Sequence, residues 1–134
     1  MDLVVDANIL FASLIRDGPT AELLFAKDLK LHVPEFILEE MDKYSGMLQE
    51  KTHRTDADFN EFMRILKRQI RLHPKGALAG WLQRAESISP DPGDIPYFAL
   101  ALMLGCGIWS NDARLKDQKD VAVYSTKDIM DMLG

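Results

Sequence analysis

The chain has 134 residues, of which 47% are apolar and 28% are charged. This length and composition predict one domain, residues 1–134, that buries its core without disulfides or structural metals. No apolar run approaches the roughly 20 residues that cross a bilayer, so we expect no membrane segment. The first residues also lack the basic stretch of a cleavable signal sequence, and we therefore expect a cytoplasmic protein.

Sixteen basic and twenty-one acidic residues give a formal net charge of -5. This charge argues against a protein that coats nucleic acid with its whole surface. It is compatible with carboxylates gathered around divalent cations and a separate basic strip. The single cysteine, Cys106, excludes an internal disulfide and is expected to be a small packed residue. The histidines His32, His53 and His73 are scattered, without the spacing of metal ligands.

Strands and helices are predicted to alternate along the first half of the chain. The opening apolar run, rich in β-branched residues, stops at the polar Asp6 and is typical of a buried parallel strand. A turn cluster then precedes an amphipathic segment of helical period. The predicted ranges are a strand at 2–6, a turn at 17–20, a helix at 21–29, a strand at 31–34 and a helix from 34 to about 51.

The second half continues this alternation. Residues 56–72 predict an amphipathic helix with one apolar and one cationic face. Residues 95–104 are apolar on every side, which predicts a helix buried against the sheet, with Asp94 at its N-cap. The other predicted elements are a helix around 77–87, strands at 107–110 and 121–124, and a last helix to 133 that Thr126 caps.

This order of elements predicts an α/β domain with a mainly parallel central sheet and helices on both faces. Ligands bind such sheets outside the carboxyl ends of the strands. Asp6 and Asp112 directly follow predicted strands, and Asp94 begins a helix that commonly faces the same edge. We therefore expect three carboxylates to converge there.

The helix after the second strand carries two adjacent acids, Glu39 and Glu40. Its predicted core stripe consists of Ile37, Met41, Tyr44 and Leu48. Glu40 lies roughly 60° from the centre of this stripe, whereas Glu39 points nearly the opposite way. An unpaired charge at the border of the core is costly, so Glu40 is predicted to bind a partner or a metal, and Glu39 to be solvated.

Several oxygen ligands without a cysteine or histidine cluster favour a hard cation, Mg²⁺ or Mn²⁺. Gathered carboxylates repel one another unless a divalent ion neutralises them, and the waters of the ion supply a nucleophile. This chemistry indicates phosphodiester hydrolysis. Each acid taken singly has a structural alternative: Asp6 as the start of a turn, Asp94 as an N-cap only, and Asp112 as an Asx turn.

Acids in apolar settings recur in four stretches that span almost the whole chain: VVDAN, PEFILEEM, DPGDIPYFALAL and IWSND. In their order and spacing, the chain resembles the PIN-domain nucleases, particularly the small prokaryotic ones that include the VapC-type toxins. The resemblance implies a three-layer α/β/α sandwich, dependence on Mg²⁺ or Mn²⁺, cleavage of RNA and a homodimer. A toxin of this kind would also have a small antitoxin protein as its partner.

The resemblance also assigns roles to residues. The catalytic, metal-binding acids would be Asp6, Glu40, Asp94 and Asp112. Asn8 and Ser110 match polar positions that support such sites, with ordinary turn and cap bonding as the open alternative. Two further alternatives stay open: Glu39 in place of Glu40, and Asp91 beside Asp94.

Cationic residues between positions 64 and 75 offer contacts to RNA phosphates, although a charged helix face is more often simply solvated. They are Arg64, Lys67, Arg68, Arg71 and Lys75. Tyr44 and Trp81 are expected to pack in the core rather than stack on bases.

The leading hypothesis is a metal-dependent endoribonuclease, with a toxin of a toxin–antitoxin pair as its more specific form. The alternatives are a housekeeping RNA-processing nuclease and a noncatalytic RNA-binding or protein-interaction module. Phosphotransfer through an aspartyl phosphate is disfavoured, because Asp6, Ala7 and Asn8 include no second acid.

Overall fold

Five parallel strands form one sheet at the centre of the computed structural model, which describes residues 1–134. The strands are β1 (Asp2–Val5), β2 (Lys30–Pro34), β3 (Ile70–His73), β4 (Gly107–Trp109) and β5 (Val123–Tyr124). Their order is β3-β2-β1-β4-β5, and every pairing is parallel. The predicted α/β fold with a parallel sheet is therefore confirmed.

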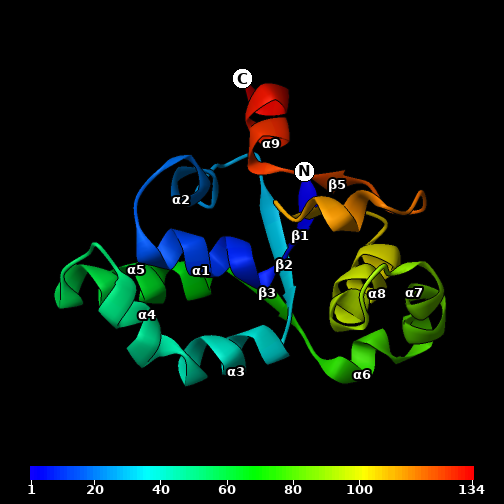
Figure 1. The fold of residues 1–134 in the computed structure, drawn as a ribbon, viewed down its shortest axis with the longest axis horizontal. Helices are drawn as coiled ribbons and strands as arrows, with labels where there is room; N and C mark the ends of the chain where they lie inside the picture. Colours follow the sequence, from blue (N-terminus) through cyan, green and yellow to red (C-terminus); the bar gives the residue numbers. More distant parts are fainter.

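Helices cover both faces of the sheet and complete three layers (Figure 1). The α-helices are α1 (Ala7–Ile15), α2 (Pro19–Leu23), α3 (Phe36–Lys43), α4 (Ser45–Lys51), α5 (Asp56–Gln69), α6 (Lys75–Leu78), α7 (Leu82–Ile88), α8 (Ile95–Leu104) and α9 (Thr126–Leu133). Short 3-10 helices are η1 (Ala79–Trp81), η2 (Pro92–Asp94) and η3 (Ala113–Lys116). Figure 1 shows α7 and α8 on one side of the sheet and α1 and α5 on the other. No helix is long and apolar enough to span a membrane.

The central strand β1 is buried on both faces. Leu3, Val4 and Val5 have no exposed surface, which agrees with the continuous apolar run of a buried parallel strand. Val5 pairs with Trp109 of β4, another fully buried side chain. The residues that follow β1 and β4 therefore leave the sheet side by side from its most buried part.

Helix α1 is the main element that sequence reasoning missed. The predicted strand at 2–6 ends one residue earlier, and Asp6 is instead the N-cap of α1, where its Oδ1 accepts a hydrogen bond from the backbone N–H of Ile9 at 3.0 Å. Ile9, Leu10 and Leu14 are buried, and Phe11 packs against the same core. Because apolar residues lie on most sides of α1, it lacks the two-faced period from which surface helices are recognised.

The predicted helices of the first half have different bounds. The helix expected at 21–29 is the shorter α2, and the helix expected from 34 to 51 is divided into α3 and α4. The division falls at Tyr44, whose backbone leaves helical geometry at φ -100° and ψ 7°. Tyr44 is 37% exposed, so its predicted core position is wrong, whereas Ile37 and Met41 are fully buried as predicted.

Strand β3 was also missed, because it follows α5 without a loop. Ile70 continues the apolar spacing of the helix, yet it pairs with Leu31 of β2. The helix predicted to reach residue 72 therefore ends at Gln69, and Arg71 lies on an edge strand. An apolar residue that suits either period leaves no signal at such a junction.

The remaining differences concern element ends. The helix predicted around 77–87 is α6, η1 and α7 in succession, and β4 and β5 are shorter than the strands predicted at 107–110 and 121–124. Ser125, rather than Thr126, caps α9 in a capping box with Asp128. The helix predicted at 95–104 is confirmed as α8, with Phe98 and Leu100 fully buried.

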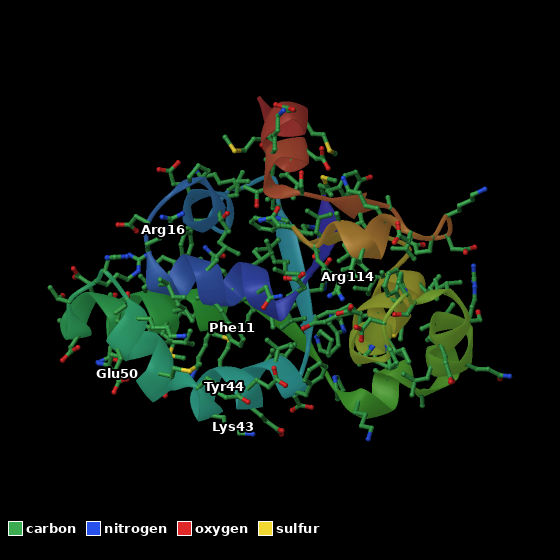
Figure 2. The ribbon with its side chains drawn as sticks, in the orientation of Figure 1. Phe11, Arg16, Lys43, Tyr44, Glu50 and Arg114 are labelled. Atoms are coloured by element: carbon green, nitrogen blue, oxygen red, sulfur yellow. The ribbon has the colours of Figure 1, made fainter.

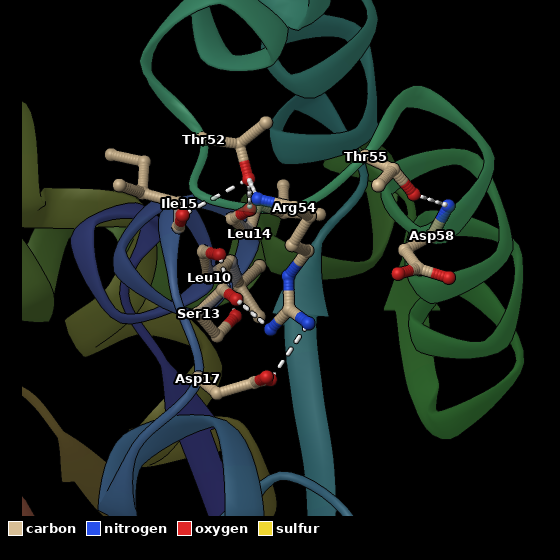
Figure 3. A network of polar contacts seen from close by, with 9 residues as sticks. All are labelled: Leu10, Ser13, Leu14, Ile15, Asp17, Thr52, Arg54, Thr55 and Asp58. Carbon is tan, nitrogen blue, oxygen red and sulfur yellow. Dashed lines mark hydrogen bonds and ion pairs between the residues drawn. The ribbon is translucent and has the colours of Figure 1, made fainter.

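Polar contacts fasten the loop before α5 to the end of α1 (Figure 3). Thr52 donates to two carbonyl oxygens at the end of α1, each at 2.9 Å. Arg54 donates to the carbonyl oxygen of Ser13 at 2.9 Å and pairs with Asp17 at 2.7 Å. Its guanidinium also lies 4.0 Å from the ring centroid of Phe62, a cation–π contact. These contacts fix the end of α1 opposite Asp6.

Candidate active site

The predicted acids meet where the order of the strands reverses. From β1 the chain builds outward through β2 and β3, then returns to add β4 and β5 on the other side of β1. Asp6 follows β1, and Ser110 and Asp112 follow β4. Ligands of open parallel sheets bind at such a switch point, outside the carboxyl ends of the strands. The fold therefore places these residues at the edge where a site is expected.

Asp6 is a buried carboxylate, with 5% of its surface exposed. Its pKa is raised, chiefly because burial penalises the charged form, and the charge of Asp112 adds to the rise. Hydrogen bonds from the Ser110 side chain and from the backbone of Ile9 and Asn8 oppose the rise. The side chain is thus held by several donors in surroundings that disfavour its charge.

Asp94 presents a carboxylate that does no capping. It occupies the N-cap position of α8, but its side chain accepts no capping hydrogen bond. The neighbouring acid does cap: Asp91 Oδ1 accepts from the backbone N–H of Gly93 at 2.8 Å. The pKa of Asp94 is raised, first by burial and then by the charges of Asp91, Asp112 and Asp6. The structural alternative for Asp94, an N-cap only, is therefore excluded.

A tyrosine that sequence reasoning did not select lies among the acids. Tyr97 of α8 is 5% exposed, and its hydroxyl oxygen accepts a hydrogen bond from the backbone N–H of Ala7 at 3.1 Å. Burial raises the pKa of this phenol, and the charges of Asp6, Glu40 and Asp94 raise it further. The charges of three predicted acids, one before α1, one in α3 and one in η2, therefore act on one hydroxyl group.

The acidic doublet of α3 is divided between two surroundings. Glu40 is half-buried, and its charge acts on the hydroxyl of Tyr97. Glu39 is exposed and lines a neighbouring pocket. This is the relation that the helical wheel predicts, with Glu40 at the border of the core.

Asp112 binds an arginine of its own turn. Its carboxylate accepts from the backbone N–H of Arg114 at 3.0 Å, from Nε at 3.1 Å and from Nη2 at 2.8 Å. The side-chain hydrogen bond from Arg114 is the main reason that the pKa of Asp112 is lowered. The backbone N–H of Asp112 in turn donates to the hydroxyl of Ser110 at 3.0 Å. The Asx turn considered for Asp112 is therefore present, and Arg114 is a cation at the edge of the acid cluster.

The oxygen donors of the cluster have the chemistry of Mg²⁺ or Mn²⁺ ligands. The pKa values of Asp6 and Asp94 are raised first by burial and then by neighbouring carboxylates, and a divalent cation would counter both causes. As arranged here, no three His, Cys, Asp or Glu side chains are grouped closely enough to hold one ion. The donor set therefore fits a divalent cation, provided that side chains move onto it.

Ser110 and Asn8, the two predicted supporting residues, are placed differently. Ser110 is buried between Asp6 and Asp112, with hydrogen bonds to both. The side chain of Asn8 is exposed, and only its backbone N–H contributes to Asp6. The structure thus gives Asn8 no side-chain role at the carboxylates.

The predicted cationic strip is not one helical face. Arg64 donates to Glu61 through Nε at 3.1 Å, and Lys67 pairs with Asp42 at 2.9 Å. Arg71 belongs to β3 rather than to the helix. Two of the cations are therefore partly neutralised by acids of the same chain.

The interpretation of the histidines as scattered is wrong for two of them. His32 Nδ1 lies 2.9 Å from His73 Nε2, and His32 Nε2 lies 2.8 Å from Asp2 Oδ1. The pairing of β2 with β3 brings the two rings together across 41 positions of sequence. Cys106 is a free, half-buried thiol whose pKa burial raises to about 11.

Comparison with known proteins defines the class first. The sequence model of the PIN-domain family matches residues 4–129 of this chain, and the chain therefore belongs to that family. VapC ribonuclease Mb0985 of Mycobacterium bovis is 29% identical over 118 residues, covering 86% of this chain and 89% of the relative. Ribonuclease VapC9 of Mycobacterium tuberculosis gives the same values.

A solved structure supports the fold independently. It is the crystal structure of VapBC2 from Rickettsia felis bound to a DNA fragment from their promoter. The TM-score is 0.67 at 10% identity, and the match covers 93% of this chain and 98% of the other. The PIN-like architecture implied by the four motifs is thereby confirmed.

Proposed function

We propose that this protein is a divalent-metal-dependent endoribonuclease, active in the cytoplasm as the toxin of a toxin–antitoxin pair. The observation that carries the proposal is the position of Asp6 and Asp112 directly after the neighbouring strands β1 and β4, at the switch point of a PIN-domain sheet, with both charges acting on Asp94. Like charges in partly buried positions are costly for stability and are characteristic of functional sites. The similarity to VapC ribonucleases supports RNA as the substrate.

The metal ligands that we propose are Asp6, Glu40, Asp94 and Asp112. Bound Mg²⁺ or Mn²⁺ would supply the activation of water and the neutralisation of charge on the phosphate. Ser110 and the N-terminus of α1 fix the orientation of Asp6 through their hydrogen bonds. Asp94 offers a carboxylate free of capping, and Arg114 must release Asp112 before that carboxylate can bind an ion.

The proposed partners follow from the same relatives. The VapC ribonucleases and the VapBC2 structure support a small antitoxin protein as a partner. We propose a homodimer as well. Among the basic residues predicted to contact RNA, Arg68, Arg71 and Lys75 make no ion pair within the chain, and we propose these three for phosphate contacts.

One observation favours a second candidate, a noncatalytic RNA-binding or protein-interaction module. Arg114 makes an ion pair with Asp112, so a cation of the chain itself already neutralises one of the four acids. A housekeeping RNA-processing nuclease would use the same acids with a different partner. The first alternative predicts no cleavage, and the second predicts cleavage that no antitoxin controls.

Cleavage of fluorescent RNA in Mn²⁺, Mg²⁺ or EDTA tests the proposal. We expect metal-dependent cleavage by the wild type and loss of it in Asp6→Asn, Asp94→Asn and Glu40→Gln. The matched control is Glu50→Gln, because Glu50 is exposed on α4, across the molecule from Arg114 (Figure 2). Equal cleavage by the Asp6 and Asp94 variants would show that the site lies elsewhere. Failure of both metals on a broad set of RNAs would favour the binding module.

A further inference from the structure

A pocket of about 600 Å³ lies beside the acid cluster, between α3 and the segment from α6 to α8. Figure 1 shows α3 on one side of the lower end of β2 and α6 and α8 on the other. Gly93 and Glu39 line the pocket, and each directly precedes an acid of the cluster, Asp94 or Glu40. The ring of Phe36, also in the lining, lies 6.2 Å from that of Tyr97. The pocket therefore adjoins the proposed site without including its four acids in the lining.

The walls of the pocket are apolar and stiff. Phe36, Leu78 and Leu82 supply apolar surface, and Pro34, Pro92 and Pro96 have their φ angles fixed by their rings. The volume is within the range of about 300–1,000 Å³ that holds small organic ligands. Proteins that read single-stranded RNA place unstacked bases on surfaces with an aromatic ring. The pocket thus has the size and lining for one nucleoside.

The polar groups of the pocket give it a preference among bases. Glu35 and Glu39 are four positions apart, which directs both carboxylates to the same side of α3. A carboxylate accepts a hydrogen bond from the exocyclic amino group of a base, whereas the carbonyl oxygen of uracil in the same place would be repelled. Lys75 is the only cation of the lining and matches a phosphate next to the base.

We propose that this pocket binds the base of a nucleotide adjoining the scissile phosphate and selects bases with an exocyclic amino group over uracil. The inference rests on the proposed nuclease function, because it places the base beside the acids that would cleave the chain. Glu35 and Glu39 contact the amino group, and Lys75 contacts the flanking phosphate. The acidic doublet then has two tasks, with Glu40 directed to the metal and Glu39 to the substrate.

The charges of the lining favour a nucleotide over an apolar side chain of a protein partner. An apolar side chain would use Phe36, Leu78 and Leu82, but it would leave Glu35, Glu39 and Lys75 without partners. A nucleotide satisfies both the apolar and the charged groups. The protein partner is therefore kept as an outcome that the experiment detects.

The first experiment measures binding, and it does not need turnover. The leucine methyl groups of the wild-type protein are observed by NMR during titration with cytidine 5′-monophosphate or uridine 5′-monophosphate in EDTA. We expect both nucleotides to shift the methyl signals of Leu78 and Leu82, with an affinity about tenfold higher for the cytidine nucleotide. In Glu39→Gln this ratio should fall towards one, because an amide both donates and accepts. The matched control Glu86→Gln changes an exposed acid of α7 outside the pocket and should keep the ratio.

The second experiment measures cleavage of a randomised RNA in Mn²⁺, with sequencing of the new ends. The wild type should disfavour uracil at one position beside the cut, Glu39→Gln should relax this preference, and Leu82→Trp, which fills the pocket, should remove it. A preference that both variants leave unchanged would overturn the inference while the nuclease function stands.

The two experiments separate the possible failures. Absence of cleavage with either metal would contradict the proposed function, and the NMR ratio would still test the pocket. Methyl signals that neither nucleotide moves, or that both move with equal affinity, would overturn the inference whatever the cleavage result. Signals that move only with a peptide of an antitoxin would assign the pocket to a protein partner and would also overturn it.

Discussion

The two ends of helix α1 carry buried charge of opposite kinds. At its start, burial raises the pKa of Asp6, and the charge of Asp112 adds to the rise. At its other end, Arg54 has a carboxylate, a carbonyl oxygen and an aromatic ring as partners (Figure 3). The carbonyl oxygen and the aromatic ring around Arg54 stabilise the fold, whereas like charges placed near one another oppose folding and are characteristic of functional sites. The comparison distinguishes contacts that stabilise the fold, at the end of α1, from charges that serve the proposed site, at its start.

The largest expected effect comes from removing one of the acids of the proposed site, near the start of α1. Asp94→Ala should lower metal-dependent RNA cleavage at least about hundredfold, because it removes a charge that acts on the reacting phosphate through the metal. Its melting temperature should stay the same or rise, since Asp94 makes no capping bond and is repelled by its neighbours.

The neighbouring acid supplies the matched comparison for Asp94→Ala. Asp91→Ala should retain metal-dependent cleavage and lose about 1 kcal/mol of unfolding free energy, because Asp91 caps η2. Urea unfolding and the cleavage assay check both variants. The distinction between the two acids would be contradicted by an Asp94 variant that loses stability and keeps its activity.

The next largest effect comes from removing Arg54, which contacts the last residues of α1. Arg54→Met should lower the free energy of unfolding by about 2 kcal/mol, through loss of the bond to the Ser13 carbonyl and of the contact with Phe62. The ion pair adds little, because the side chain of Asp17 is 85% exposed. Urea unfolding measures the loss. Cleavage per folded molecule should be unchanged, and a large fall at full folding would show that the two ends of α1 are coupled.

A smaller effect is expected from removing the hydroxyl of Tyr97, which contacts the start of α1. Tyr97→Phe keeps the ring but removes the hydroxyl oxygen that accepts from the N–H of Ala7, which should cost about 1 kcal/mol of stability. Because this bond joins α8 to the start of α1, we also expect Mn²⁺ binding, followed by electron paramagnetic resonance, to weaken several-fold. Unchanged Mn²⁺ affinity would restrict Tyr97 to packing.

The smallest expected effect concerns Asp128, an acid outside the proposed site whose hydrogen-bond partners favour its charged form. Asp128 accepts from the N–H of Ser125 and from Lys116, and these partners lower its pKa from 3.8 to about 2. A depressed pKa in the folded state gives stability that is present above about pH 3.8 and is lost as the pH falls towards 2. In Asp128→Asn, the free energy of unfolding measured with urea should change less with pH across this window. A curve as steep as that of the wild type would assign the loss to other acids.

Much of the fold follows from local sequence. Strands β1 and β2 are short apolar runs that stop abruptly, and the uninterrupted apolar stretch of α8 has no other place than against a sheet. The positions of Asp6 and Asp112 follow from strand ends alone, because parallel strands share one carboxyl edge. By contrast, α1 was missed because apolar residues lie on most of its sides, and β3 was missed because it follows α5 without a loop.

What sequence reasoning missed at the site depends on contacts between distant residues. Tyr97 is read as packing within an apolar helix, although its place one turn after Asp94 is a signal that both side chains share a face. The pairing of His32 with His73 depends on strand register, which no local pattern specifies. Arg114 was passed over because its exposed side chain reads as solvated until its bonds to Asp112 are seen.

Asp6 is the only residue between strand β1 and helix α1. The direction of its carboxylate therefore depends on the number of residues between β1 and α1 as much as on any contact. One residue inserted before Ala7 would keep the strand and the helix but, at 3.6 residues per turn, would rotate the helix by roughly 100° relative to the acid. A change of one residue in length at this junction would therefore remove the site even though every acid is kept.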